Sequence, residues 1–254
     1  MAAFQESEIL SSKRSWKEEA LVHAKAEMPR ESCGLLVVIK GRKRYWPCKN
    51  LTADTENFIL DPDDYCKAEE AGTIVGVVHS HPKTPPYPSV ADRLACKQSE
   101  LPWEIVNPIL ETWGSCKPEN FEPDLVGREW VWNVMDCWSC VHTWYKQQGL
   151  DLPDYKRPVT PEEFDANPLF ERYWADAGFY ELAEGEQLQV GDALLMSIGT
   201  NSLNHVGVLV ENNCVQHHLR GRLSSVDMYG GWLERCTGRR LRHYDWKTLT
   251  VHAE

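Results

Sequence analysis

Two histidines and an aspartate have the spacing of ligands to one metal ion. The chain reads His79-Ser80-His81-Pro82, and Asp92 follows after a proline-rich loop. Residues 73–78 form an apolar, partly β-branched run that predicts a buried strand. Because residues i and i+2 of a strand face the same side, both histidines can reach one ion while Ser80 points away. With Asp92 one turn into the next helix, the pattern predicts a hydrolytic zinc site, which needs three protein ligands and an open position for water.

Each part of this pattern also has an ordinary structural explanation. Ser89 and Asp92 have the spacing of a capping box at a helix start. His79 and His81 could be a pair of half-buried strand histidines. The joint spacing with Pro82 favours the metal site. Ligand type alone leaves iron or manganese open as alternatives to zinc.

A second set of residues with hydrolase chemistry lies in the other half of the chain. Cys137 begins a predicted helix over 137–148, and His205 opens an apolar strand. A helix N-terminus and a nearby imidazolium both lower a thiol pKa, which predicts a nucleophilic thiolate. A third polar group would hold the imidazole in its working tautomer. A three-residue turn after the strand would give this role to His217, and a two-residue turn would give it to His218.

Cys137 has two other interpretations. A buried cysteine on a helix is a common structural residue. The spacing of Cys137 and Cys140 is also that of a redox motif, but that motif needs a βαβ context, which the flanking sequence does not offer. The distant histidines favour the nucleophile.

The composition fits a soluble protein with one large domain or two of ordinary size. The chain has 254 residues, of which 42% are hydrophobic and 26% charged. Its net charge of −11 disfavours sequence-independent binding to nucleic acid. No run predicts a transmembrane segment or a signal peptide. The odd number of nine cysteines, without a repeating framework, predicts folding in a reducing cytoplasm.

The order of predicted elements indicates two domains. In the first half, helices over 7–27, 62–72 and 89–99 alternate with a hairpin over 33–46, a short strand over 58–60 and strands over 73–79 and 103–106. This order predicts an α/β sandwich for residues 1–112. Residues 113–123 predict a linker because they lack periodicity and carry glycine and proline. Residues 124–254 begin with a helix and continue as strands, which predicts an α+β domain.

The first half resembles the JAMM/MPN (Mov34/PAD1-like) metallopeptidases. Their signature is a distant glutamate, then His-x-His-Pro, seven residues to Ser, and two to Asp. The resemblance implies His79, His81 and Asp92 as zinc ligands. It implies that Glu31 polarises the bound water and that Ser89 donates a hydrogen bond to the developing oxyanion. Every position of the signature is occupied.

The second half resembles the NlpC/P60 cysteine peptidases, which have a papain-like α+β fold. Their nucleophile follows an aspartate at a helix start, as Cys137 does, and their catalytic histidine opens a His-Val-Gly strand, as His205 does. Their third polar residue lies twelve positions on, which selects His217. Two positions depart from the family. Trp138-Ser139 stands where Ser-Gly is usual, and Trp130 stands where a tyrosine is expected; an indole donates one hydrogen bond but accepts none.

A JAMM domain in front of an NlpC/P60 domain resembles the lambda-like phage tail assembly protein K family. The resemblance covers nearly the whole chain. It implies a tail tip protein that hydrolyses peptidoglycan stem peptides and has other tail-tip proteins as partners. It implies a location in the host cytoplasm during assembly, with the virion tail tip as a second location. Two other functions stay open: an assembly protease that trims a tail protein, and a structural factor that uses the two folds for docking.

Overall fold

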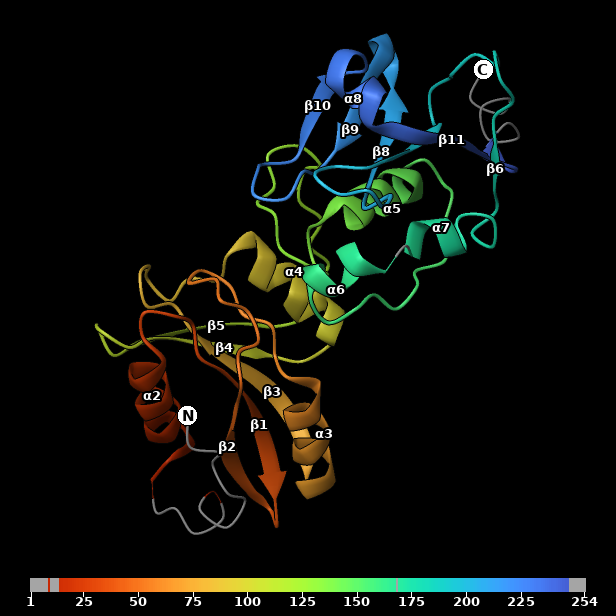
Figure 1. Cartoon of the computed structure of the whole chain (residues 1–254). Coiled ribbons are helices and arrows are strands. Elements are labelled where there is room, and N and C mark those ends of the chain that lie inside the picture. The colour runs from red at the N-terminus through yellow and green to blue at the C-terminus, as the bar shows by residue number, and fades with distance from the viewer. Residues whose placement is uncertain (1–8, 10–13, 168, 247–254) are drawn as a thin grey trace. The chain divides into compact units, whose positions relative to one another are not determined.

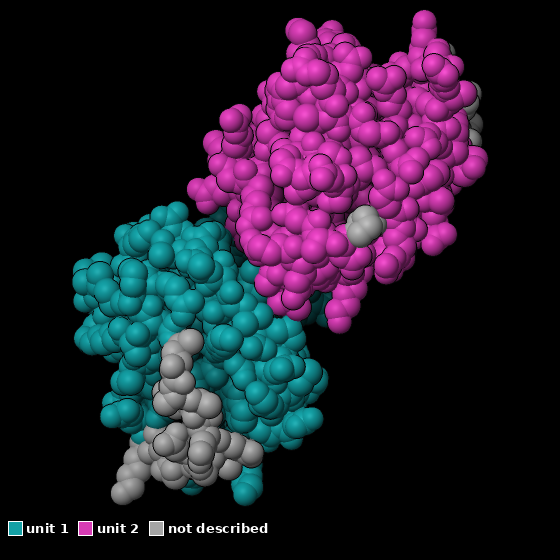
Figure 2. All heavy atoms as spheres, viewed as in Figure 1, with its two compact units in different colours: residues 1–122 teal, residues 123–254 magenta. Residues whose placement is uncertain are grey.

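The computed structural model describes residue 9 and residues 14–167 and 169–246 (Figure 1). They divide into two compact units, 1–122 and 123–254 (Figure 2). Each unit has its own sheet and its own hydrophobic clusters. No helix in the described part of the chain is long and apolar enough to cross a membrane.

The first unit is built around a five-stranded mixed sheet in the order β2-β1-β3-β4-β5. The strands are β1 (Cys33–Ile39), β2 (Arg42–Cys48), β3 (Thr73–Ser80), β4 (Trp103–Asn107) and β5 (Thr112–Cys116). Strands β3 and β4 are parallel, and the other neighbours are antiparallel. The predicted hairpin is confirmed, with Lys40 and Gly41 both at positive φ in its turn. The strand expected over 58–60 is wrong, because only Leu60 pairs there, in an isolated bridge with Asn50.

Helices cover both faces of this sheet (Figure 1). Alternate residues of β1 point to opposite sides, so Leu35 packs in one cluster with Ala68 of α3 (Pro62–Ala71). Leu36 packs in the other cluster with Ala20 of α2 (Trp16–Glu27). Helix α4 (Val90–Ser99) adds Cys96 to the α3 side. The predicted α/β sandwich is confirmed.

Two boundaries differ from the expected ones. Helix α2 begins after the capping box of Ser15 and Glu18, and the residues expected to precede it as helix lie partly outside the described residues. The linker expected over 113–123 begins later, because its first residues belong to strand β5. Gly114, which suggests a loop in the sequence, pairs with Ile105 of β4. A Cβ atom there would lie 1.8 Å from the carbonyl oxygen of Pro86, so the proline-rich loop can approach the strand only at glycine.

The second unit has a six-stranded sheet in the order β10-β9-β8-β7-β11-β6, with every neighbouring pair antiparallel. The strands are β6 (Phe179–Glu181), β7 (Ala193–Met196), β8 (His205–Val210), β9 (Cys214–His217), β10 (Ser225–Met228) and β11 (Thr237–His243). The two short helices α6 (Pro161–Ala166) and α7 (Leu169–Tyr173) precede β6.

One helix packs on each face of this second sheet. Helix α5 (Cys137–Gln147) packs Val141 and Tyr145 against Val206 of β8. Helix α8 (Gly231–Cys236) packs Leu233 against Leu194 on the opposite face. A helix followed by an antiparallel sheet is the predicted α+β order, which is confirmed.

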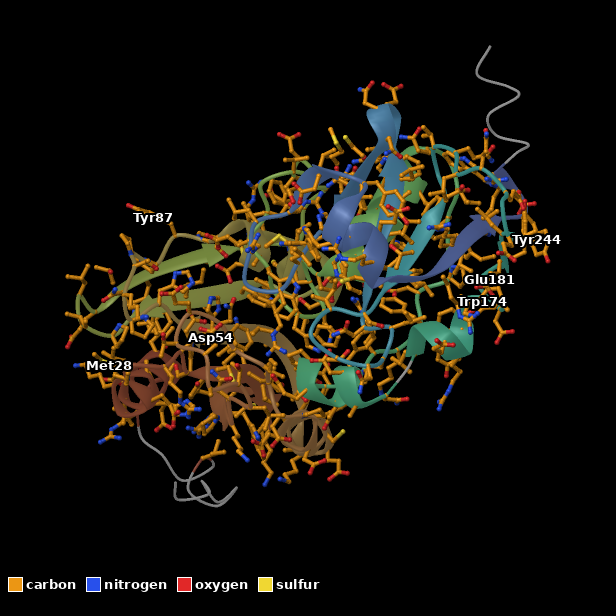
Figure 3. The ribbon with its side chains drawn as sticks, turned by 45° about the horizontal axis from the view of Figure 1, so that its top comes forward. Met28, Asp54, Tyr87, Trp174, Glu181 and Tyr244 are labelled. Carbon is orange, nitrogen blue, oxygen red and sulfur yellow. The ribbon has the colours of Figure 1, made fainter. Side chains whose placement is uncertain are left out.

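Two arginines of strand β11 form ion pairs with neighbouring segments, one near the surface and one buried. Glu181 and Trp174 lie together at the β6 edge (Figure 3), where Arg239 pairs with Glu181 at 2.6 Å and lies 5.8 Å from the Trp174 ring. Arg242 is buried and binds Asp192 through two bonds of 2.7 and 2.8 Å. Asp192 directly precedes β7, the neighbour of the His205 strand. This buried bidentate pair therefore anchors the sheet that carries the histidines.

Substituting Asp192→Ala is expected to lower the free energy of unfolding by about 1.5–3 kcal/mol, because it removes the two buried hydrogen bonds to Arg242, which keeps only Glu186 as an ionic partner. The matched control is Glu234→Ala, which removes a partner from the exposed Arg240–Glu234 pair in the same unit and should change stability little. Urea unfolding of the full chain, followed by tryptophan fluorescence, measures both. Equal losses in the two variants would contradict the anchoring role.

Candidate active site and metal centre

The first site lies where strand β3 ends. His79 is the penultimate residue of β3, and His81 follows it after Ser80. The Ser80 hydroxyl points away from the histidines and accepts a hydrogen bond from the backbone N–H of Ser32. The two Nε2 atoms of His79 and His81 lie 3.1 Å apart. The expected placement of both rings on one side is confirmed.

Asp92 joins these histidines from helix α4. Its two carboxylate oxygens lie 3.1 Å from His79 Nε2 and 3.3 Å from His81 Nε2. Asp92 is also the third residue of the helix, where it closes a capping box with Ser89, so the structural and the metal-site interpretations hold together. Burial would raise the pKa of Asp92, but the two histidines hold it well below its usual range. The carboxylate is therefore ionised.

The outer nitrogens determine where the ring protons lie. His81 Nδ1 is 3.2 Å from the carbonyl oxygen of Pro85, which can only accept, so Nδ1 carries the proton and Nε2 is left with a lone pair. His79 Nδ1 is buried without a hydrogen-bond partner. Two imidazole nitrogens and a carboxylate thus converge from a buried shell.

This geometry fits a zinc ion. Ligands at about 2.0–2.1 Å from zinc in a tetrahedron lie about 3.3 Å from one another. The two histidine Nε2 atoms lie 3.1 Å apart, and each lies 3.1–3.3 Å from a different one of the two Asp92 oxygens, so either oxygen can complete a set of three ligands near this spacing. In the described part of the chain, this is the one group of three such side chains close enough to share an ion.

Glu31 and Ser89 border this cluster. Glu31 is buried, and burial raises its pKa. The nearby His79 and His81 rings oppose this rise in part, and the resulting pKa is about 7. Ser89 is exposed, and its oxygen accepts the N–H of Asp92 at 3.1 Å. Its own hydroxyl proton is therefore left to donate to another group.

The second site lies at the start of helix α5. Asp136 is the buried N-cap and accepts the N–H of Ser139, while Ser139 accepts the N–H of Asp136. Ser139, one of the two residues that depart from the expected Ser-Gly, therefore closes a capping box. The cap makes Cys137 the first residue of the helix, and the backbone N–H groups of Val206 and Trp138 hydrogen-bond its sulfur.

The hairpin after β8 has the three-residue turn that favours His217. Glu211–Asn213 forms this turn, and His217 pairs with Gly207 across the two strands. His217 therefore faces the same side as His205, with its Nδ1 atom 3.1 Å from His205 Nε2. His218 binds the carbonyl oxygen of Arg222 through its Nε2 atom and lines the cleft that Cys137 and His205 share. Because His205 Nε2 is occupied, Nδ1 is the ring nitrogen left for a thiol.

Sequence reasoning missed Asp227. This residue of β10 lies with its Oδ2 atom 2.9 Å from His217 Nε2. The strand is short and mostly exposed, so no hydrophobic periodicity marks it. The only available signal was the acidic residue ten positions after His217, and such spacing has no general meaning.

The expected ionisation of the cysteine is wrong for the resting site. Burial raises the pKa of Cys137 to about 12, and the neighbouring Asp136 charge adds to this. Burial also lowers the pKa of His205 to about 3. The desolvation penalty outweighs the favourable helix terminus, so the pair rests as a neutral thiol and a neutral imidazole. His205 can then take the thiol proton as the sulfur attacks.

Cys137 and His205 open into one cleft of about 290 Å³. Trp130 lines the cleft as well, so the residue that departs from the expected tyrosine does lie at the site. Its ring stacks on Trp132 with centroids 6.1 Å apart, and the Arg220 guanidinium lies 5.5 Å from it. The cleft therefore combines a thiol, an imidazole, an aromatic wall and a guanidinium.

Comparison with known proteins agrees with this two-part layout. Residues 13–121 match the family described as prokaryotic homologs of the JAB domain, and residues 113–241 match the NlpC/P60 family. The tail tip assembly protein K of Escherichia phage N15 is 37% identical over 229 residues, which cover 89% of this chain and 93% of that protein. The chain belongs to the tail tip assembly protein K family. The protein of the same name from Escherichia phage lambda is 31% identical over 188 residues, covering 74% and 91% of the two chains.

Among solved structures, a JAB1/MPN domain protein from Archaeoglobus fulgidus is 20% identical, with a TM-score of 0.29. It covers 43% of this chain and 91% of its own. The family assignment rests on the two family matches and on the two phage proteins.

Alkylation of Cys137 by iodoacetamide is expected to rise about tenfold per pH unit from pH 6 to 10, because a thiol with a raised pKa gains thiolate throughout this range. Peptide mass spectrometry after timed labelling of the full chain measures the rate at each cysteine. The exposed Cys66 serves as an internal comparison and should react faster at pH 7. A plateau in the Cys137 rate below pH 8 would show a preformed thiolate and contradict the neutral pair.

Proposed function

We propose that this tail tip assembly family member is a peptidoglycan endopeptidase. The observation that carries the proposal is the Cys137–His205–His217 arrangement: the cysteine at a helix start and His205 line one cleft, and His217 Nδ1 lies 3.1 Å from His205 Nε2. The reaction is hydrolysis of amide bonds in the stem peptides of the cell wall. We also propose that residues 1–122 and 123–254 are separate hydrolase domains joined near residue 122.

In the second unit, Cys137 acts as the nucleophile. As its sulfur attacks the scissile carbonyl, the thiol proton passes to His205 Nδ1, which then returns it to the leaving amine. His217 binds Nε2 of the same ring and keeps it oriented. Water then hydrolyses the thioester, with His205 as the base, and restores the free thiol.

In the first unit, His79, His81 and Asp92 would hold a zinc ion, because their spacing fits its tetrahedral ligand shell. When bound, zinc lowers the pKa of a coordinated water to about 7 and polarises a carbonyl. Glu31 carries a proton from the attacking water to the leaving amine, a role that suits a buried carboxyl beside the cluster. Ser89 donates a hydrogen bond from its hydroxyl to the oxyanion.

The charge and shape of the cleft support a stem peptide as substrate. Stem peptides are extended and carry carboxylates, and Arg220, which lines the cleft beside the Trp130 ring and pairs with Glu162 and Asp165, could exchange one of these partners for a substrate carboxylate. We assign bonds near diaminopimelate to the cysteine unit and isopeptide-type amide bonds to the zinc unit. We place the protein in the host cytoplasm during tail assembly and then at the virion tail tip, with other tail-tip proteins as partners.

A second function is favoured by the two phage relatives, which are tail tip assembly proteins. The same sites could trim a tail protein during assembly. This function expects a shortened tail protein in lysates of phage with the intact gene and a full-length one with Cys137→Ala. Full-length tail proteins in both lysates would exclude it.

His79→Ala is expected to reduce bound zinc from about one per chain to a small fraction, because it removes one of three ligands. Mass spectrometry of the metal content of purified full-length protein measures this. His23→Gln is the control, since His23 is a buried histidine of the same unit that bonds Tyr45 instead. Unchanged zinc in His79→Ala would refute the assigned ligand set.

Incubation of the full chain with purified peptidoglycan fragments is expected to release cleaved stem peptides. Cys137→Ala should lower the rate of the main cleavage by on the order of 10³-fold or more, because nothing else in the cleft replaces the thiol. Mass spectrometry of the fragments identifies the bond. His79→Ala should leave this cleavage unchanged and abolish only a separate, metal-dependent one. If the zinc-loaded, folded chain releases no fragment, the proposed wall substrate is wrong.

A further inference from the structure

The third residue of the cysteine site is His217, and its residue type alone does not determine which of its two ring nitrogens carries the proton. A neutral imidazole carries one proton on either of its two nitrogens. If the proton of His217 lay on Nδ1, it would point at His205 Nε2, which is 3.1 Å away. His205 would then have to accept there and carry its own proton on Nδ1. With Nδ1 protonated, His205 could not take a proton from Cys137.

The contact on the far side of His217 removes this ambiguity. Its Nε2 atom lies 2.9 Å from Asp227 Oδ2. Because a carboxylate only accepts, the His217 proton must lie on Nε2. His217 Nδ1 is then an acceptor for the Nε2–H of His205. This in turn leaves His205 Nδ1 with the lone pair that a base needs.

We propose that Asp227 is a positioning residue that sets the tautomers of His217 and, through it, of His205. This inference rests on the proposed peptidase function of the Cys137 site. It extends the site to a chain of four residues, of which only the first two touch the reacting atoms. The Asp227 charge also stabilises the positive charge that His205 gains when it accepts the thiol proton.

The surroundings of Asp227 suit this role. Ser225 pairs with His217 in the β9–β10 ladder, so Asp227, two residues on, faces the same side of the sheet. The Ser225 hydroxyl donates to the same Oδ2 atom at 3.0 Å. The hydrogen bonds from His217 and Ser225 hold the pKa of Asp227 below its usual range, so the acceptor is a carboxylate at neutral pH.

Burial makes the arrangement asymmetric. The His217 side chain is fully buried, whereas the Asp227 side chain is 50% exposed. The carboxylate is thus solvated on its outer side, and a charge can sit there at little desolvation penalty. An uncharged surface partner, or water alone, would leave both His217 tautomers available.

Nitrogen NMR of the full chain with ¹⁵N-labelled histidine tests the tautomers directly and needs no substrate. The wild-type chain is expected to show His217 with an unprotonated Nδ1 and a protonated Nε2, and the signals are assigned by their loss in His217→Gln. Asp227→Ala should convert this to a mixture of the two tautomers. A protonated Nδ1 in the wild-type chain would overturn the proposal.

Cleavage kinetics on peptidoglycan fragments give the second readout. Asp227→Ala should lower kcat/KM by about 10–100-fold, the usual effect of removing a group that orients a catalytic ligand from behind. Asp227→Asn can turn either its amide oxygen or its amide NH2 toward His217 Nε2, so it should give a mixture of the two tautomers and a rate between those of the wild-type chain and Asp227→Ala. The control Glu211→Ala, which removes an exposed acid from the turn of the neighbouring hairpin, should keep the full rate.

The two readouts separate the failure of this inference from the failure of the proposed function. If the wild-type chain cleaves no wall fragment but shows the expected tautomers that Asp227→Ala disturbs, the substrate is wrong and the positioning role stands. If the wild-type chain cleaves and Asp227→Ala matches it in both rate and tautomer, the positioning role is wrong.

Discussion

Each half of this chain contains a pair of buried imidazoles whose facing nitrogens lie 3.1 Å apart. The other groups of each site determine what lies between these two nitrogens. Two such nitrogens can lie this close only if one donates a hydrogen bond to the other or if both have lone pairs directed at a cation. In the first unit, Asp92 adds an ionised carboxylate to two nitrogens, which suits a cation. In the second unit, Asp227 accepts a hydrogen bond from the outer nitrogen of His217, which suits directed proton transfer.

The strands and helices supply these groups by simple periodicity. His79 and His81 share a side because they are two residues apart at the end of β3, and His205 and His217 share one because a three-residue turn sets their register. A helix start then provides the remaining group at each site. Asp92 is the third residue of α4, and Cys137 is the first residue of α5. In both helices a capping box holds the functional residue in place.

Much of this arrangement follows from local sequence patterns. The apolar run before His79, the capping signals of α4 and α5, and the turn length after β8 are short-range features, and the structure confirms the placement they predict. Strand β5 escaped prediction because Gly114 is there for close contact with the Pro86 backbone rather than for a turn. Asp227 was not predicted because it lies beside His217 only through the pairing of β9 with β10, which the sequence does not reveal.

The protonation state of Cys137 also could not be predicted from the sequence. The helix start and the histidine predict a lowered thiol pKa, but the outcome depends on how completely the fold excludes water from the sulfur. Cys137 is 6% exposed and His205 is 4% exposed. At that burial both groups favour their neutral forms, so the site depends on proton transfer during attack and on a correctly placed lone pair on His205.

The central claim is that Cys137 attacks the substrate and carries its acyl part. The measurement that tests this most directly is the intact mass of the full chain, quenched in acid milliseconds after mixing with a soluble stem-peptide fragment. We expect a transient mass increase equal to the acyl half of the fragment, located on the Cys137 peptide. Product release at full rate with no adduct on Cys137 at any time would contradict the account.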